Sequence, residues 1–140
     1  MRRVAAFFAA VILLSSCGGD DPGTVPKDPV ADCGFPEPGA AARAAEVPEP
    51  LVMEGAEVFR AQTRQGRQVI GLVVPHSVQE AFDFYRRAAK EVGYDVLQLD
   101  NEGFEAELFL KAGRELAQFT IRSSACEGVV AVYLNLPVDG

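Results

Sequence analysis

The sequence predicts an α+β domain in which an antiparallel sheet carries one amphipathic helix. Six segments rich in β-branched and other apolar residues are separated by short turns, which is typical of antiparallel strands. One stretch with apolar residues at helical spacing lies between the second and third of these segments. The expected order along the chain is therefore strand, strand, helix and four strands (ββαββββ).

The first two expected strands are Glu57–Thr63 and Gln68–Val74, joined by a turn around Gln65 and Gly66. The second is an almost continuous run of Val, Ile and Leu, which suits a central position in a sheet. Pro75 cannot donate a backbone hydrogen bond and is expected to end this strand.

A helix is expected to begin after Ser77, because Ser77 and Glu80 have the spacing of a capping box. In this motif the serine hydroxyl accepts from the Glu80 N–H, and the Glu80 carboxylate accepts from the Ser77 N–H. Gly93 provides a left-handed residue that can end the helix. The expected buried face consists of Val78, Ala81, Phe82, Tyr85, Ala89 and Val92.

The remaining strands are expected at Tyr94–Asp100, Phe104–Lys111, Arg114–Arg122 and Val129–Leu136. Alternation of apolar and polar residues is cleanest in Phe104–Lys111, which indicates one core face and one wetter face. The expected core face of that strand consists of Phe104, Ala106, Leu108 and Leu110.

Residues 1–16 have the features of a signal peptide. Arg2 and Arg3 precede the apolar run Val4–Leu14, which is shorter than the about 20 residues of a membrane span but fits a signal-peptide hydrophobic region. The ending Leu14-Ser15-Ser16-Cys17 resembles the lipobox of bacterial lipoproteins. This resemblance implies cleavage before Cys17 and a diacylglycerol thioether on its sulfur. The alternative is a cysteine within an ordinary signal peptide.

Two further regions follow the expected cleavage site. Residues 17–31 comprise Cys17 and a Gly-, Pro- and Asp-rich stretch, expected to be a flexible tether. Residues 32–140 have the size of a single domain. The first part of this domain is Pro-bounded and irregular, with at most one helical turn at Ala40–Ala45.

The charge balance bears on partners and location. The formal net charge is −7, and loss of Arg2 and Arg3 with the signal peptide leaves 11 basic and 20 acidic residues, a net charge of −9. Such a balance opposes binding to nucleic acid and to anionic lipid head groups. We expect an extracytoplasmic protein held on the cell membrane or the outer membrane by its lipid anchor.

Cys33 and Cys126 remain once Cys17 is assigned to lipid, and two cysteines in an exported protein usually pair. A disulfide would tie the start of the domain to the turn before the last strand. Closing a loop of this length would stabilise the fold by about 4 kcal/mol in the chain-entropy model. The alternative is two free thiols.

We expect no catalytic, cofactor-binding or metal-binding residue. His76 is the only histidine, and no H-E-x-x-H or C-x-x-C accompanies it. Ser77 lies beside it, but the helix cap explains Ser77 better than a role as nucleophile does, and no G-x-S-x-G surrounds it. The junction Val74–Ser77 contains no glycine for a phosphate loop, which disfavours nucleotide binding.

Two further groups of residues have a functional and a structural interpretation. The acidic residues Asp100, Glu102, Glu105 and Glu107 could attract calcium, but their spacing departs from an EF-hand, so a solvated turn is favoured. Phe84 is aromatic and lies off the expected buried face of the helix, so it is a candidate for a ligand pocket.

The mature sequence also resembles a group of small uncharacterised bacterial lipoproteins. The similar segments are Gly55-Ala56-Glu57-Val58, Val74–Val96 with its FYR-containing helix before a glycine and an aromatic residue, and the strand that starts at Gly113. The resemblance covers most of residues 51–136. It implies a compact extracytoplasmic module and transfers no catalytic residue.

Two classes of function are compatible with these observations. The first is a non-enzymatic envelope module that binds a protein, a peptide or an envelope component through a sheet face or an edge strand. The second is a small-molecule carrier or an unrecognised hydrolase with a pocket between helix and sheet near His76, Phe84 and Tyr94. A filled helix–sheet interface would favour the first, and a deep cavity with convergent polar groups would favour the second.

Overall fold

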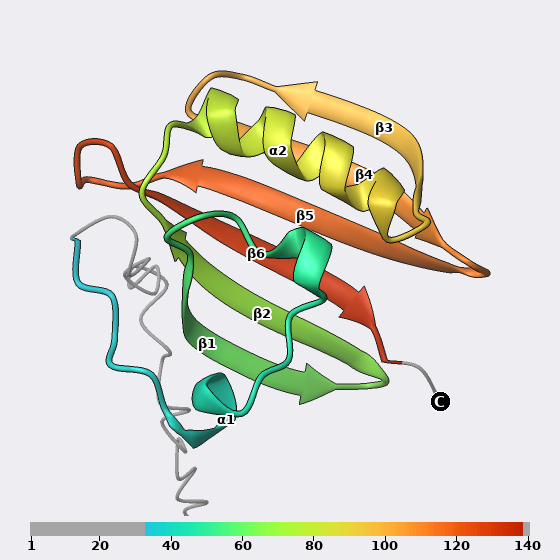
Figure 1. The fold of residues 1–140 in the computed structure, drawn as a ribbon, viewed down its shortest axis with the longest axis horizontal. Helices are drawn as coiled ribbons and strands as arrows, with labels where there is room; N and C mark the ends of the chain where they lie inside the picture. The colour runs from blue at the N-terminus through green and yellow to red at the C-terminus, as the bar shows by residue number, and fades with distance from the viewer. Residues whose placement is uncertain (1–32, 139–140) are drawn as a thin grey trace, which may run out of the picture.

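The computed structural model describes residues 33–138 (Figure 1). The expected signal peptide, Cys17 and the expected tether over residues 17–31 lie outside this range. In chain order the elements are α1 (Ala40–Arg43), the 3-10 helix η1 (Glu49–Leu51), β1 (Glu57–Arg64), β2 (Arg67–Val74), α2 (Val78–Glu91), β3 (Asp95–Asn101), β4 (Glu105–Ala112), β5 (Glu115–Ser123) and β6 (Val130–Pro137).

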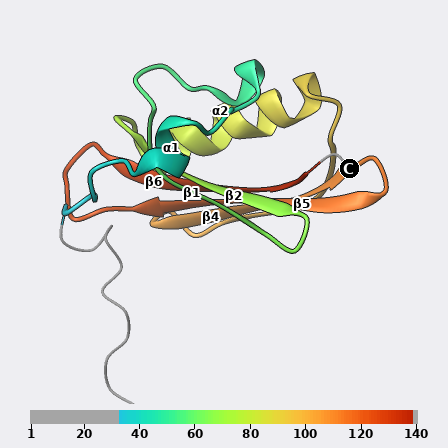
Figure 2. The same ribbon diagram turned by 90° about the horizontal axis from the view of Figure 1, so that it is seen from below.

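The strands form one six-stranded antiparallel sheet in the order β1-β2-β6-β5-β4-β3. Helix α2 lies across one face of this sheet (Figure 2). The predicted α+β architecture with one main helix is confirmed, and two short helices precede β1. Helix α1 lies where one helical turn was considered at Ala40–Ala45, whereas η1 was not expected. Within residues 33–138, no helix has the length and apolarity needed to cross a membrane.

Strand β6 joins the two parts of the sheet. It pairs with β5, its neighbour in sequence, and with β2, which belongs to the hairpin before α2. The last strand therefore lies in the centre of the sheet. This arrangement leaves β1 and β3 as the two edge strands.

The core lies between α2 and the sheet face that it covers. The helix contributes six buried residues, namely Val78, Ala81, Phe82, Tyr85, Ala88 and Ala89. Alternate strand residues face them, as the period of two in a strand requires. These include Ile70, Leu72, Leu108, Leu110, Phe119, Ile121, Val132 and Leu134.

One predicted core residue is exposed. Phe104 was expected to begin the buried face of its strand, but it is 61% exposed. The physical reason is that β4 begins only at Glu105, so Phe104 belongs to the preceding turn and escapes the alternation of the strand. The other three residues of that predicted face, Ala106, Leu108 and Leu110, are buried.

Both ends of α2 agree with the sequence prediction. Glu80 N–H donates to Ser77 Oγ (3.2 Å), and Ser77 N–H donates to the Glu80 carboxylate (2.9 Å), so the capping box is present. At the other end Gly93 has a φ of 81°, a conformation that glycine adopts without a Cβ clash. These local signals explain why the helix is bounded where it is.

We expect Ser77→Ala to lower the free energy of unfolding by about 1 kcal/mol, because the Glu80 N–H at the start of α2 loses the hydroxyl that accepts its hydrogen bond. Ser77→Thr keeps a hydroxyl at this position and should lose less. Chemical denaturation of both variants measures the difference. Equal stability of Ser77→Ala and the native protein would contradict the assigned role of the cap.

Tyr85 fills the centre of the helix–sheet interface and is 0% exposed. Its ring contacts Phe84 and Phe119 edge-on, with ring centroids 5.1 and 5.9 Å away. The hydroxyl is buried and makes no hydrogen bond with any described residue. Burial raises the pKa of this hydroxyl, so the side chain is neutral over the ordinary pH range.

We expect Tyr85→Phe to leave the free energy of unfolding unchanged or to raise it by up to about 1 kcal/mol, because the change removes an unpaired buried polar group and keeps the ring. Tyr85→Leu, which also removes the ring contacts, serves as the comparison and should destabilise. Denaturant titration of the three proteins measures this. A large loss of stability in Tyr85→Phe would show that the hydroxyl has a partner.

Candidate binding surface at the edge of the sheet

The two residues that suggested catalysis are held by structural contacts. Ser77 Oγ lies 2.7 Å from the Glu80 carboxylate, to which it donates, and the His76 Nε2 atom lies 3.2 Å from the backbone carbonyl of Glu54. His76 Nδ1 is 4.0 Å from the same carboxylate of Glu80. The pKa of Glu80 is lowered, chiefly by the backbone hydrogen bond from Ser77 and then by its hydroxyl. This geometry matches a helix cap rather than a nucleophile paired with a base.

Two of the four acidic residues near the β3–β4 hairpin are engaged with neighbouring side chains. Glu105 forms an ion pair with Arg122 (2.6 Å), and Glu107 accepts a hydrogen bond from Gln118 (3.1 Å). Among the residues that the structure describes, no group of three or more His, Cys, Asp or Glu side chains is placed to hold a metal ion.

The space between helix and sheet is filled by side chains. Phe84 is partly buried and packs against the core, and the Tyr94 ring lies 6.4 Å from that of Phe119. His76 lines a surface groove of about 260 Å³ at the β5–β6 end of the domain, whereas Tyr94 lines different grooves near Pro137. The structure therefore does not bring His76 and Tyr94 together in one pocket.

Strand β3 is one of the two edge strands of the sheet. It pairs with β4 on one side, and Figure 1 shows no strand beyond it. Most of its residues are exposed, including Leu97 (55%) and Leu99 (39%). A register shift between Val96 and Gln98 places a bulge near the start of the strand. From Gln98 to Asn101 the pairing with β4 is regular, so this part of the edge offers an ordinary strand backbone.

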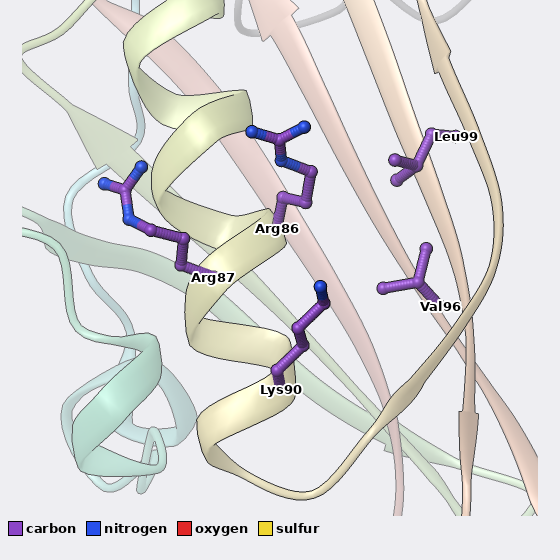
Figure 3. A pocket seen from close by; sticks show the side chains of 5 residues that line it. All are labelled: Arg86, Arg87, Lys90, Val96 and Leu99. Atoms are coloured by element: carbon purple, nitrogen blue, oxygen red, sulfur yellow. The ribbon is translucent and has the colours of Figure 1, made fainter.

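A groove of about 400 Å³ lies between β3 and α2 (Figure 3). Its lining combines three basic residues of the helix with two apolar residues of the strand, namely Arg86, Arg87, Lys90, Val96 and Leu99. Figure 3 shows Arg86 and Lys90 on the flank of the helix nearer β3, while Arg87 leaves the other flank. Arg86 also pairs with Asp83 of the same helix at 3.4 Å. The groove is basic, although the whole chain has a net charge of −7.

A second groove, of about 500 Å³, lies on the sheet face that α2 leaves uncovered. Leu97 and Gln98 of β3 form its outer side, and Phe109 and the 61% exposed Leu116 contribute apolar surface. Arg67 closes the far side, where its guanidinium donates to Asn135 Oδ1 (2.7 Å) and to the Leu116 carbonyl (2.6 Å). Strand β3 therefore has a basic groove on one face and an apolar groove on the other.

An edge strand was expected as one possible binding surface, but the basic groove beside it was not. Arg86 and Lys90 fall outside the expected apolar face of the helix, and their spacing of four residues was the available signal. Their relation to Val96 and Leu99 depends on how α2 crosses the sheet, which is a tertiary property. Comparison with models of protein families gave no match, and a search of curated proteins also gave none.

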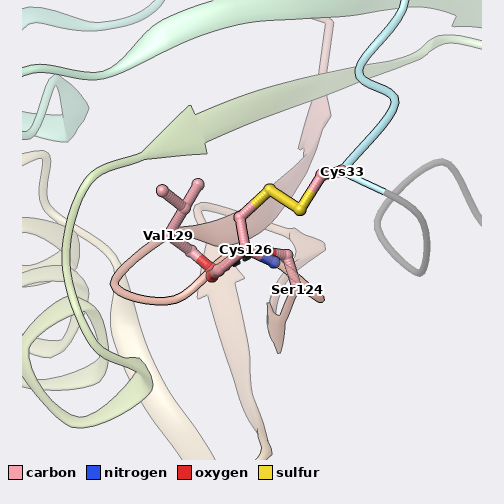
Figure 4. Close-up of a disulfide and its surroundings, with 4 residues drawn as sticks. All are labelled: Cys33, Ser124, Cys126 and Val129. Carbon is pink, nitrogen blue, oxygen red and sulfur yellow. Dashed lines mark hydrogen bonds between the residues drawn. A yellow bond between two sulfur atoms is a disulfide. The ribbon is translucent and has the colours of Figure 1, made fainter.

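The predicted disulfide between Cys33 and Cys126 is present (Figure 4). The two Cα atoms are 5.4 Å apart, and 93 positions separate the residues in sequence. The loop that carries Cys126 is ordered by Ser124, whose hydroxyl lies 2.6 Å from the Val129 carbonyl and accepts from the Cys126 N–H (3.1 Å). The bridge therefore fixes the start of the described chain to the β5–β6 turn.

Proposed function

We propose that this protein is a lipid-anchored extracytoplasmic module that binds an extended segment of another envelope protein at strand β3. The observation that carries this proposal is the exposed edge with Leu97 and Leu99 on it. Edge strands are usually protected by charged side chains, bulges, proline or a covering element. On β3 the charged residues Asp95 and Asp100 lie near the two ends and the bulge lies near the start, so the exposed leucines stand between the two aspartates. A peptide that adds a strand beside Gln98–Asn101 can use the outward backbone groups of β3.

The expected location rests on the sequence around Cys17 and gains support from the disulfide. Structural disulfides are common in exported proteins and rare in the cytosol. The Cys33–Cys126 bridge therefore agrees with a lipobox at Leu14–Cys17 and with export. A lipid anchor would hold β3 near other proteins of the same membrane, which favours short-range recognition of a neighbouring chain.

The core supports a binding module over a carrier with an internal pocket. Tyr85 is 0% exposed and fills the interface in which a small-molecule pocket was considered. His76 and Ser77 are engaged in contacts at the start of α2. Two grooves, one basic and one apolar, lie on the two sides of β3.

We expect Cys17→Ser to abolish lipid attachment, so that the protein accumulates as an uncleaved precursor or as a soluble product. Detergent phase partitioning and the mass of the N-terminus measure the two effects. Cys126→Ser, which keeps the lipobox intact, is the control and should remain in the detergent phase. Recovery of Cys17→Ser in that phase, processed at the same position, would exclude the proposed anchor.

Site-directed photo-crosslinking in intact cells tests binding at β3. A crosslinking residue at Gln98 should give an adduct of one defined mass, whereas a crosslinker at the 50% exposed Val52 should not. Leu99→Lys in the same chain should remove the Gln98 adduct. The same adducts from both positions, or insensitivity to Leu99→Lys, would overturn the proposal. An adduct of twice the mass of the protein would identify a second copy of this chain as the partner. That result would also contradict the proposal that the partner is another envelope protein.

A further inference from the structure

We infer that the segment bound at β3 is acidic, with carboxylate side chains at alternate positions that face α2 and apolar side chains between them. This inference rests on the proposed binding at β3 and specifies the chemistry of the partner. The decisive feature is that a basic groove separates α2 from β3, the strand that carries the free edge (Figure 3).

The spacing of the basic side chains fits an extended chain. Arg86 and Lys90 lie four residues apart on α2, and four residues of a helix rise about 6 Å along its axis. Two residues of a strand advance about 6.6 Å, and side chains at this interval lie on the same face. Helix α2 runs alongside β3 (Figure 1). Carboxylates two positions apart on an added strand can therefore meet Arg86 and Lys90 together.

The other face of the added strand meets different chemistry. Its intervening side chains would point toward the sheet face that α2 leaves uncovered, where Leu97 is 55% exposed and borders the apolar groove with Phe109. Apolar residues at these positions would bury surface that is now in water. Acidic and apolar residues should thus alternate along the bound segment.

The neighbouring acidic residues limit where the carboxylates can lie. Asp83 already pairs with Arg86, so Lys90 and the outer part of the Arg86 guanidinium supply most of the attraction. Asp95 and Asp100 stand near the two ends of β3, opposite Lys111 and Glu107 of β4. Carboxylates of the partner are therefore expected beside the middle of the strand, between these two aspartates.

The same charges argue against two other occupants. Antiparallel pairing of β3 with β3 of a second copy would bring Arg86 and Lys90 of both chains to one seam, where like charges repel. An anionic lipid head group could neutralise the bases but could not supply the backbone donors and acceptors that a strand edge leaves open. An acidic extended peptide satisfies both the bases and the edge.

Peptide binding to the mature lipidated protein in neutral detergent tests the inference. The probes are fluorescent peptides of alternating valine and glutamate, and of alternating valine and glutamine. We expect the glutamate peptide to bind more tightly, with an affinity that falls as salt is added. The double variant Arg86→Gln, Lys90→Gln should weaken its binding roughly tenfold and leave the glutamine peptide little changed. Arg60→Gln, at an exposed position on β1, is the matched control.

The outcomes separate the inference from the proposed function. Equal affinity for both peptides, with binding of both lost in Leu99→Lys, would overturn the acidic preference and leave binding at β3 standing. Failure of both peptides to bind would count against binding at β3 as well. Soluble short-chain phosphatidylglycerol is tested as a competitor of the glutamate peptide, with short-chain phosphatidylcholine, whose head group has no net charge, as the control. Displacement of the glutamate peptide by the anionic lipid alone, with Leu99→Lys without effect, would assign the groove to lipid and overturn the inference.

Discussion

Removal of the disulfide by Cys33→Ser and Cys126→Ser is expected to lower the free energy of unfolding by about 4 kcal/mol in the chain-entropy model. The bridge spans a sequence separation of 93, so its loss greatly enlarges the unfolded ensemble. This is a large share of the about 5–15 kcal/mol that stabilises a typical domain. Denaturant titration of the double variant and of the oxidised protein measures the difference.

Limited proteolysis should show where the loss acts. The first part of the domain is Pro-bounded and irregular in sequence, which would leave the bridge as its main attachment to the sheet, but in the structure the second half of residues 33–50 has further contacts. Ala42 is 4% exposed, and Leu51, which follows it, is 0% exposed and belongs to the core. The Phe35 ring makes an edge-on contact with Phe59 at 5.4 Å, but most residues around it are exposed, namely Gly34, Pro36, Glu37 and Gly39. New cleavage is therefore expected first around residues 33–39.

Thiol labelling provides the control for this prediction. In the unreduced, denatured mature protein, Cys33 and Cys126 should resist labelling until a reductant is added. Stoichiometric labelling of both before reduction would show that the bridge does not form in the cell. The Ser124 contacts with Cys126 and Val129 should keep the β5–β6 turn ordered after reduction. Loss of the circular-dichroism signal of the sheet on reduction would therefore contradict the prediction that only residues 33–39 become accessible first.

Local sequence signals accounted for most of the element boundaries. The expected strand Gln68–Val74 differs from β2 by one residue at its start, and the expected Arg114–Arg122 differs from β5 by one residue at each end. The Ser77 cap and the Gly93 stop defined the helix because capping depends on residues within one turn. Such signals need no knowledge of the rest of the fold.

Properties that depend on distant pairing could not be predicted in this way. Nothing within Val130–Pro137 indicates that β6 pairs with β2, although this pairing makes it a central strand. The basic groove likewise forms only because Arg86 and Lys90 of α2 lie beside β3, which is a different element of the chain. The sequence placed these side chains only on the polar side of a helix, because periodicity identifies a face but not its neighbour.

The sequence gives no reason for a glycine at position 71, and the structure provides one. It lies within β2, opposite Tyr133 of β6 and Arg60 of β1. The 5% exposed ring of Phe59 covers it, and a Cβ on Gly71 would stand 2.8 Å from Phe59 Cζ. Phe59 also contacts Tyr133 edge-on at 6.0 Å. Glycine is used here for the close approach of an aromatic ring to the backbone.

We expect Gly71→Val to lower the free energy of unfolding by about 2–3 kcal/mol, because the added side chain must displace the Phe59 ring. Valine itself favours a strand more than glycine does, so the sign of the effect depends on this clash. A double-mutant cycle with Phe59→Ala separates the two terms. In the Phe59→Ala background the same substitution should cost much less or should stabilise. A cost of equal size in both backgrounds would show that Gly71 is required for a reason other than the ring above it.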